Sequence, residues 1–231
     1  MEVHILSGGA AQGVVRGLEQ SFLDETGARL QATFGAVGMM KEKLLGGAPC
    51  DVLILTQALI DELEQSGRVE SGSAAALGRV KTGVAVKAGE AQPDVSSADG
   101  LRAALLAARG IYFPDPQKAT AGIHFINVVK KLGIFSDIEA ALRPFPNGAT
   151  AMAQMAQADE PGLLGCTQVT EILYTPGVSL VAPLPVEFEL ATVYTAALST
   201  RADQPELARR LIAALSGETS KALREQGGFE L

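Results

Sequence analysis

The stretch Thr33–Ile54 reads TFGAVGMMKEKLLGGAPCDVLI and predicts a strand, a helix and a second strand in close succession. We expect strands over Arg29–Phe34 and Asp51–Thr56, separated by a helix over Val37–Leu45 that ends at Gly46-Gly47. The run DVLILT is almost wholly apolar, which is typical of a strand that is buried on both faces. Alternating strands and helices indicate an α/β fold with a largely parallel sheet.

The same alternation extends in both directions from this stretch. A strand over Val3–Leu6 and a helix over about Ala10–Glu25 precede it, and Gly27 is expected to end that helix. After Gly78 a second set of strands and helices begins. We therefore expect two α/β lobes, residues 1–79 with 192–231 and residues 80–191, joined by a hinge with a central cleft between them.

The composition excludes several classes of partner. The chain has 231 residues, a net charge of −7, 47% hydrophobic residues and only 5% aromatic residues. An acidic chain without a Lys/Arg cluster is not expected to bind nucleic acid, and no apolar run is long enough to span a membrane. A small anion remains a possible ligand, because helix N-termini supply positive potential without a charged side chain.

The glycine-rich segment SGGAAQG at Ser7–Gly13 follows a strand and opens a helix, as a dinucleotide-binding loop does. However, Ala10 stands where that motif has its middle glycine, and the next strand does not end in an acidic residue. We therefore expect no cofactor. We also expect no metal site, since Cys50 and Cys166 lack metal-ligand spacing. Buried free thiols are favoured for both, although a disulfide remains open.

Small residues recur where helices are expected to begin. They occur at Ser7–Ala10, Gly35–Met39, Ala119–Gly122 and Pro146–Thr150, and a fifth start at Cys166–Thr170 carries hydroxyl and amide groups. Free N–H groups at such starts can form a neutral cradle for an oxyanion or a carboxylate. The alternative is that glycine and alanine only permit tight turns between strand and helix.

The sequence also resembles the molybdate-binding proteins, which are type II solute-binding proteins of bacterial ABC importers. The resemblance rests on the GAP-x-D-V junction at Gly47–Val52, the segment DPQKATAGIHFINVVKKLG at Asp115–Gly133, and the closing GGF at Gly227–Phe229. It implies a type II periplasmic-binding-protein fold, hinge closure on a small anion and, if the protein is exported, an ABC permease as partner.

The resemblance also implies a binding site. This chain matches the family at some positions of that site and differs from it at others. Ala10 stands where the family has serine, Ala36-Val37-Gly38 where it has a serine-rich turn, and Gln168 where it has tyrosine. The remaining polar groups suit an organic carboxylate at least as well as molybdate. The predicted ligand-binding residues are Ser7, Gly8, Gly9, Ala10, Val37, Gly38, Thr120, Ala121, Gly122, Asn147, Gly148, Thr167, Gln168 and Thr170.

Three functions fit these features. The first is a solute-binding protein without catalysis. The second is an isomerase or tautomerase with His124 as the general acid/base, and the third is a ligand sensor that acts through a partner protein. No signal peptide is recognisable, so we expect a cytoplasmic protein as the sequence stands and a periplasmic one if it begins at a mature N-terminus.

Overall fold

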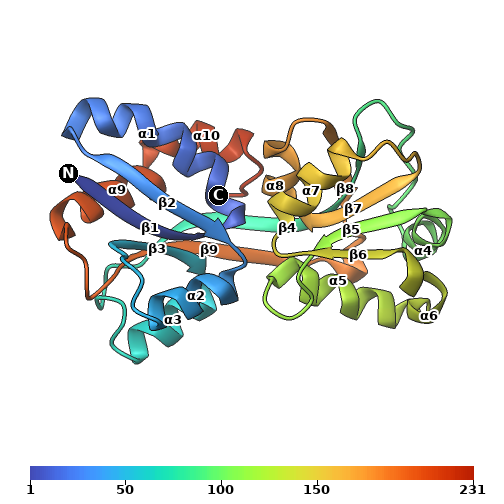
Figure 1. Ribbon diagram of the computed structural model, residues 1–231, viewed down its shortest axis with the longest axis horizontal. Coiled ribbons are helices and arrows are strands. Elements are labelled where there is room, and N and C mark those ends of the chain that lie inside the picture. The colour runs from blue at the N-terminus through green and yellow to red at the C-terminus, as the bar shows by residue number, and fades with distance from the viewer. The chain divides into compact units, whose positions relative to one another are not determined.

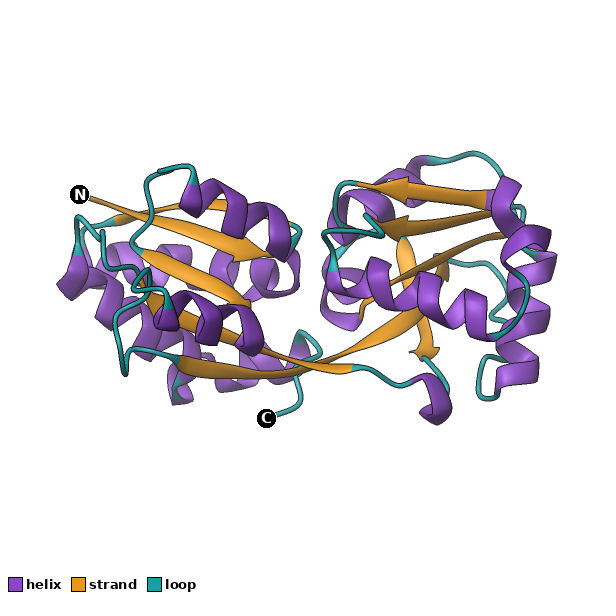
Figure 2. Ribbon diagram, turned by 90° about the horizontal axis from the view of Figure 1, so that it is seen from below, coloured by secondary structure: helices purple, strands orange, loops and turns teal.

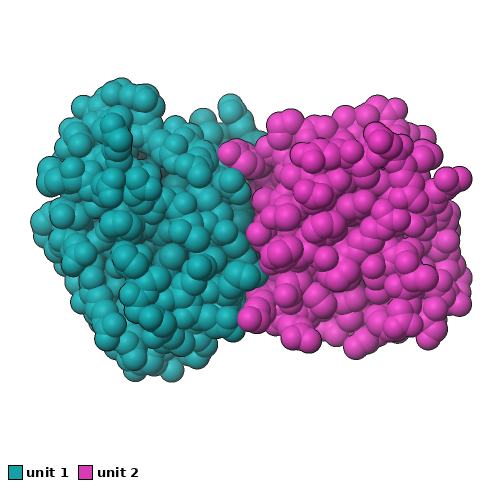
Figure 3. All heavy atoms as spheres, in the orientation of Figure 1, with its two compact units in different colours: residues 1–80, 192–231 teal, residues 81–191 magenta.

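The computed structural model describes residues 1–231, which form two compact units. Unit 1 contains Met1–Val80 and Thr192–Leu231, and unit 2 contains Lys81–Ala191 (Figure 3). The chain crosses between the units in strand β4 (Ala75–Lys87) and at the start of strand β9 (Ala191–Leu198). Unit 2 is therefore an insertion within the sequence of unit 1. Within unit 2, the entering and leaving segments are joined, since Thr82 N donates a hydrogen bond to Leu190 O at 3.2 Å.

The sheet of unit 1 has the strand order β2-β1-β3-β9-β4. Strand β1 (Glu2–Gly8) pairs in parallel with β2 (Arg29–Gly35) and with β3 (Val52–Thr56), whereas β9 runs antiparallel to β3. All five residues of β3 are buried, which confirms the prediction from its apolar sequence. The parallel pairs bring the ends of β1, β2 and β3 to one edge of the sheet.

Helices cover both faces of this sheet (Figures 1 and 2). Figure 1 shows α1, α9 and α10 on one face and α2 and α3 on the other. Their bounds are Gln12–Thr26 for α1, Val37–Leu45 for α2, Gln57–Gln65 for α3, Pro205–Ser216 for α9 and Lys221–Gln226 for α10, with 3-10 turns at Gly9–Ala11 and Glu218–Ser220. Gly27 follows α1 with φ of 68°, the left-handed conformation expected of a glycine that ends a helix.

Two polar clusters tie the C-terminal part of unit 1 to its N-terminal part. The buried carboxylate of Asp51 accepts hydrogen bonds from His4 N at 2.7 Å and from Gln204 N at 2.9 Å. These bonds join the starts of β3 and α9 to β1.

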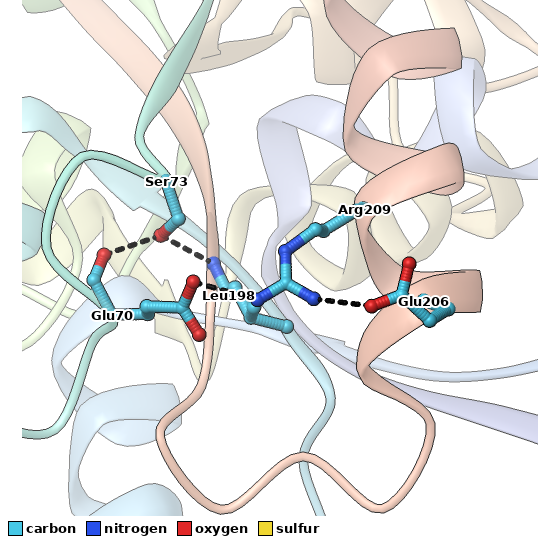
Figure 4. Close-up of polar contacts among 5 residues, drawn as sticks. All are labelled: Glu70, Ser73, Leu198, Glu206 and Arg209. Carbon is cyan, nitrogen blue, oxygen red and sulfur yellow. Dashed lines mark hydrogen bonds and ion pairs between the residues drawn. The ribbon is translucent and has the colours of Figure 1, made fainter.

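The second cluster lies on the surface of unit 1 (Figure 4). Ser73 Oγ accepts from Leu198 N at 3.0 Å and donates to Glu70 O at 2.6 Å. Arg209 of α9 binds Glu70 Oε1 at 2.7 Å and Glu206 Oε1 at 2.8 Å. The segment before β4 is thereby fastened to both β9 and α9.

In unit 2 the strands β4-β7-β5-β6 lie in that order, and β8 (Val178–Pro183) pairs with β4. Strand β5 (Gly110–Pro114) runs parallel to β7 (Leu163–Gln168) and to β6 (Leu142–Phe145), whereas β4 runs antiparallel to β7. The starts of the helices that follow β5, β6 and β7 therefore lie along one edge of the sheet.

The helices of unit 2 enclose two hydrophobic clusters. One cluster includes α4 (Ala98–Ala107) and α5 (Thr120–Lys131), and the other includes α7 (Gly148–Gln157) and α8 (Val169–Tyr174). The short elements are α6 at Phe135–Ile138 and 3-10 turns at Glu139–Ala141 and Val186–Phe188.

Two local predictions for unit 2 need correction. Strand β6 was not expected, because its sequence LRPF is short and contains proline. The sequence also predicts that Ser96, with Asp99 three residues later, caps α4, and this prediction is wrong. Ser96 Oγ instead donates to Asp94 Oδ1 at 2.6 Å, and Ser97 Oγ is the cap, which accepts from Gly100 N at 3.1 Å.

Candidate functional site

In unit 1 the predicted residues gather at the ends of β1 and β2. Gly8 and Gly35 are register partners, so the two helix starts that follow them are neighbours. A Cβ atom on Gly8 would lie 2.8 Å from Val37 Cγ1, which shows how closely the start of α2 packs on the end of β1. Neither Gly8 nor Ala36, the residues preceding these helical segments, supplies a side-chain cap. Backbone amides are therefore the main donors here.

Ser7 is completely buried, and its hydroxyl has a partner within unit 1. Ser7 Oγ donates to Gly8 O at 2.9 Å. Gly9 and Ala10 are also buried, in the 3-10 turn that precedes α1. The hydroxyl oxygen of Ser7 keeps its lone pairs for a further donor, whereas its proton is used by the chain.

The first start in unit 2 follows β5. Ala119 precedes α5 and provides no side-chain cap, Ala121 and Gly122 are buried, and Thr120 is half-buried. A Cβ atom on Gly122 would lie only 2.3 Å from the carbonyl oxygens of Pro114 and Asp115. Glycine is thus required for the close approach of α5 to the end of β5, whatever else it does.

The second start in unit 2, at α7, is already partly satisfied by side chains. Asn147 Oδ1 accepts a hydrogen bond from Thr150 N at 2.8 Å, as an N-cap residue does. The amide of Ala149 is bound by the carboxyl group of Glu171. Two first-turn amides of α7, those of Ala149 and Thr150, therefore already have side-chain partners within unit 2.

Polar side chains are concentrated at the third helix start of unit 2, where β7 leads into α8. Thr167, Gln168 and Thr170 are all buried. The hydroxyl oxygen of Thr170 has no hydrogen-bond partner in the structure, and neither has that of Thr82, which is 1% exposed. Thr82 is the register partner of Gln168, which places this second unsatisfied residue on the neighbouring strand β4. Buried hydroxyl groups normally have a partner, so these two identify a place where a polar ligand or water can bind.

Glu171 lies beside the same residues, although sequence analysis did not select it. Its carboxyl group accepts a hydrogen bond from Thr167 Oγ1 at 2.5 Å and from the backbone amides of Gln168 and Ala149. Burial raises the pKa of Glu171 to about 7, while these hydrogen bonds oppose the shift. Its position in the sequence could have identified it. Glu171 is the third residue of α8, from which a glutamate side chain can reach back to the amide of the N-cap residue, Gln168.

The histidine considered for catalysis is held by the backbone. His124 Nε2 lies 2.7 Å from Phe188 O, and because a carbonyl oxygen only accepts, Nε2 carries the proton. His4 lies in β1 with Nδ1 3.6 Å from Asp51 Oδ2, as part of the cluster that fastens α9. The structure therefore gives both histidines contacts within their own units.

Both cysteines are free and buried, as the sequence favoured. Burial raises the pKa of Cys50 to about 12 and raises that of Cys166 as well, so neither thiol is a nucleophile near neutral pH. No helix of the chain has both the length and the apolar character needed to cross a membrane. The predicted ligand-binding residues include no lysine, arginine or histidine.

Known structures with this fold include binders of inorganic anions. The periplasmic molybdate-binding protein of Azotobacter vinelandii superimposes with a TM-score of 0.81 at 19% identity and 99% coverage of both chains. The sulfate-binding protein SubI of Mycobacterium tuberculosis superimposes with a TM-score of 0.75 at 14% identity, covering 99% of this chain and 86% of the other. These likenesses establish the type II periplasmic-binding-protein fold.

A sequence relative has a different described activity. The aconitate isomerase of a Pseudomonas species is 26% identical over 233 residues, covering 96% of this chain and 86% of the relative. The family model for the bacterial extracellular solute-binding proteins matches residues 3–230, nearly the whole chain. Together with the fold, this match shows that the chain belongs to the bacterial extracellular solute-binding protein family.

Proposed function

We propose that this chain is a solute-binding protein whose ligand is a small carboxylate-bearing anion. The observation that carries the proposal is the gathering of uncapped helix starts and buried hydroxyl groups at one sheet edge in each unit, with no cationic side chain among the predicted residues. Backbone amides at helix N-termini bind an anion without a counter-charge, since their dipoles supply the positive potential.

A carboxylate is favoured over a tetrahedral oxyanion by the donors that remain. Ala10 has no hydroxyl, the proton of Ser7 is donated to Gly8 O, and Asn147 Oδ1 caps its own helix. A doubly charged oxyanion would thus rely on few amides in an acidic chain of net charge −7. An organic acid spreads its charge over separate carboxylate groups, and its carbon atoms can make apolar contacts.

The test is a thermal-shift screen with molybdate, tungstate, sulfate, citrate, cis-aconitate and trans-aconitate. A ligand at about 100 times its dissociation constant stabilises a protein by about 2.7 kcal/mol, which a melting curve resolves. We expect stabilisation by one or more organic acids and little by the tetrahedral oxyanions. A response to molybdate alone would overturn the choice of carboxylate, and unchanged curves with all six would overturn the proposal.

The screen also addresses the prediction that one ligand contacts donors from both units. Gly38→Pro removes an amide at the start of α2 in unit 1, and Thr120→Pro removes one at the first residue of α5 in unit 2. If one ligand uses both sets with hinge closure, each variant weakens its binding. Loss in only one variant would restrict the site to that unit. In an import role, the ligand-bound protein would deliver to a membrane permease.

The likeness to aconitate isomerase favours a second candidate, an isomerase of unsaturated acids on the same fold. Moving a double bond requires a base that removes a proton from the adjacent saturated carbon. The electron pair then spreads over three carbons and a neighbouring carboxylate, and the proton returns at the far carbon, so no co-reactant is consumed. For His124, Nδ1 is the ring nitrogen left for this transfer, since Nε2 is bonded to Phe188 O.

Proton NMR of cis-aconitate incubated with the protein distinguishes the two candidates. Formation of trans-aconitate would support the isomerase, and binding without conversion would support the solute-binding protein. If conversion occurs, His124→Gln is expected to abolish it while leaving aconitate binding in place. Conversion at an unchanged rate would remove His124 from the reaction.

A further inference from the structure

Glu171 connects three segments of unit 2 that were predicted to contact the ligand. Its carboxyl group binds Thr167 Oγ1 on β7 at 2.5 Å, the amide of Gln168 before α8, and the amide of Ala149 in the first turn of α7. The bond to Gln168 N is the side-chain half of a capping box, in which the third helical residue reaches back to the N-cap amide. The bond to Ala149 N extends this cap to a second helix.

The start of α7 fits the carboxyl group because residue 148 is glycine. A Cβ atom there would lie 1.9 Å from Glu171 Oε2 and 2.0 Å from Thr167 Oγ1. Asn147 Oδ1 occupies the amide of Thr150, and Glu171 that of Ala149. These two hydrogen bonds hold the first turn of α7 in place, and with it the backbone amide of Gly148.

No cation accompanies this buried carboxyl group. The elements packed against α7 and α8 carry few ionisable groups, and Arg143 on β6 is engaged by Tyr112 and Glu160. Lys87 of β4 donates to Ala158 O, at the opposite end of α7. Also on β4, Lys81 pairs with Glu189 at 3.0 Å and Arg79 with Glu230 at 3.6 Å. The other ionisable groups are Tyr112 on β5, Cys166 on β7 and Tyr174 on α8. An ionised Glu171 is therefore balanced only by neutral donors.

We propose that Glu171 is a positioning residue for the ligand: its carboxyl group holds the starts of α7 and α8 in register, and its ionisation weakens the binding of an anion at the start of α7. The inference rests on the proposed function, that the chain binds a small carboxylate. The adjacent Thr170, whose buried hydroxyl oxygen has no partner, independently marks this part of unit 2 as a place for a polar ligand.

The physical reason lies in the charge at the helix starts. A neutral carboxyl group leaves the positive end of α7 available to a ligand anion, whereas a carboxylate neutralises it and repels the ligand. Because burial raises the pKa of Glu171 to about 7, this change falls within the physiological range. Ligand affinity is then expected to fall as the pH rises from 6 to 8.

Calorimetric titration with trans-aconitate at about pH 6 and about pH 8 tests the inference, with Glu171→Gln and the matched control Glu160→Gln. Glu160 is a carboxylate of the same unit, paired with Arg143 at 2.9 Å. Ionisation of aconitate itself affects all three proteins alike. We expect the fall in affinity to be about threefold to tenfold larger in the unmodified protein and in Glu160→Gln than in Glu171→Gln. Equal falls in all three would overturn the positioning role.

Amide chemical shifts measured without ligand provide the second readout. In the unmodified protein the amides of Ala149 and Gln168 should titrate together near neutral pH, and in Glu171→Gln they should not. Failure of trans-aconitate to bind any of the proteins would count against the carboxylate ligand and against the effect on binding. Absence of the shared amide titration would overturn the connection between the two helix starts, independently of any ligand.

Discussion

Thr167 donates a hydrogen bond to Glu171 at 2.5 Å, within a cluster that is sealed from solvent and holds no cation. The folded protein therefore binds the proton of Glu171 more tightly than the unfolded chain does. The pKa of this carboxyl group rises from its ordinary value of 4.5 to about 7. The resulting stability is fully present below pH 4.5 and is lost as the pH rises through about 7.

We predict that Glu171→Gln flattens this dependence on pH. One pKa unit corresponds to about 1.4 kcal/mol, so ionisation of Glu171 lowers the free energy of unfolding by about 3 kcal/mol between pH 4.5 and pH 8. Urea unfolding of both proteins at several pH values measures the difference. Glu160→Gln should retain the slope of the unmodified protein, and a Glu171→Gln curve with that same slope would contradict the prediction.

Gly148→Ala is expected to lower stability by about 3 kcal/mol, because the added methyl group overlaps the carboxyl group of Glu171 and the hydroxyl of Thr167. The cost should shrink when Glu171→Ala makes room. A double-mutant cycle measured by denaturant unfolding provides the check. Additive losses would mean that the two positions do not compete for the same space.

Asp51 and His4 should respond very differently to removal, although the two residues are partners. Asp51→Ala leaves the amides of His4 and Gln204 without their acceptor and should cost about 2–5 kcal/mol. His4→Ala keeps the backbone amide that makes the short bond, so it should cost about 0.5 kcal/mol. Thermal unfolding of the two variants measures both losses of stability. Similar losses would contradict the prediction, because they would mean that the imidazole of His4 also stabilises the fold.

The surface cluster of unit 1 offers a comparable contrast. Ser73→Ala removes the acceptor of Leu198 N, a buried amide, and is expected to cost about 1–3 kcal/mol. Arg209→Ala breaks two exposed ion pairs, which water and salt already screen, so little change is expected. Urea unfolding of the two variants at low and high salt measures these losses. A large, salt-dependent loss of stability in Arg209→Ala would contradict the prediction that its ion pairs contribute little.

The thiols of Cys50 and Cys166 should not react with dithionitrobenzoate in the folded protein near pH 8. Both are buried, and burial favours the neutral thiol over the reactive thiolate. Both should react once urea unfolds the chain. Rapid reaction of one thiol under native conditions would indicate local opening of the unit that contains it.

Much of the fold was predictable because its signals are local. The apolar run of β3, the helix stop at Gly27 and the small-residue starts at Gly8 and Gly122 each reflect a constraint from nearby backbone. Strand β6 was missed because its pairing with β5 depends on residues about thirty positions away. Its four residues have no periodicity of their own.

The candidate site was less accessible to prediction, since it depends on which polar groups the chain uses internally. The side chain of Asn147 was predicted to contact a ligand, yet its oxygen caps α7 instead. Thr82 is one polar residue in a β-strand, and only the packed structure reveals that its hydroxyl oxygen is buried without a partner. Glu171 was not selected from the sequence, because only folding brings Ala149 and Thr167 to its carboxyl group.

The hydrogen bond between Thr82 N and Leu190 O means that the inserted segment leaves unit 1 and returns at neighbouring points of the chain. A segment whose two ends meet can be exchanged for another without displacing the framework that holds it. Unit 2 can therefore be replaced as a whole module while the core of unit 1 is retained. Such modularity allows one scaffold to acquire new ligands in a single step of recombination.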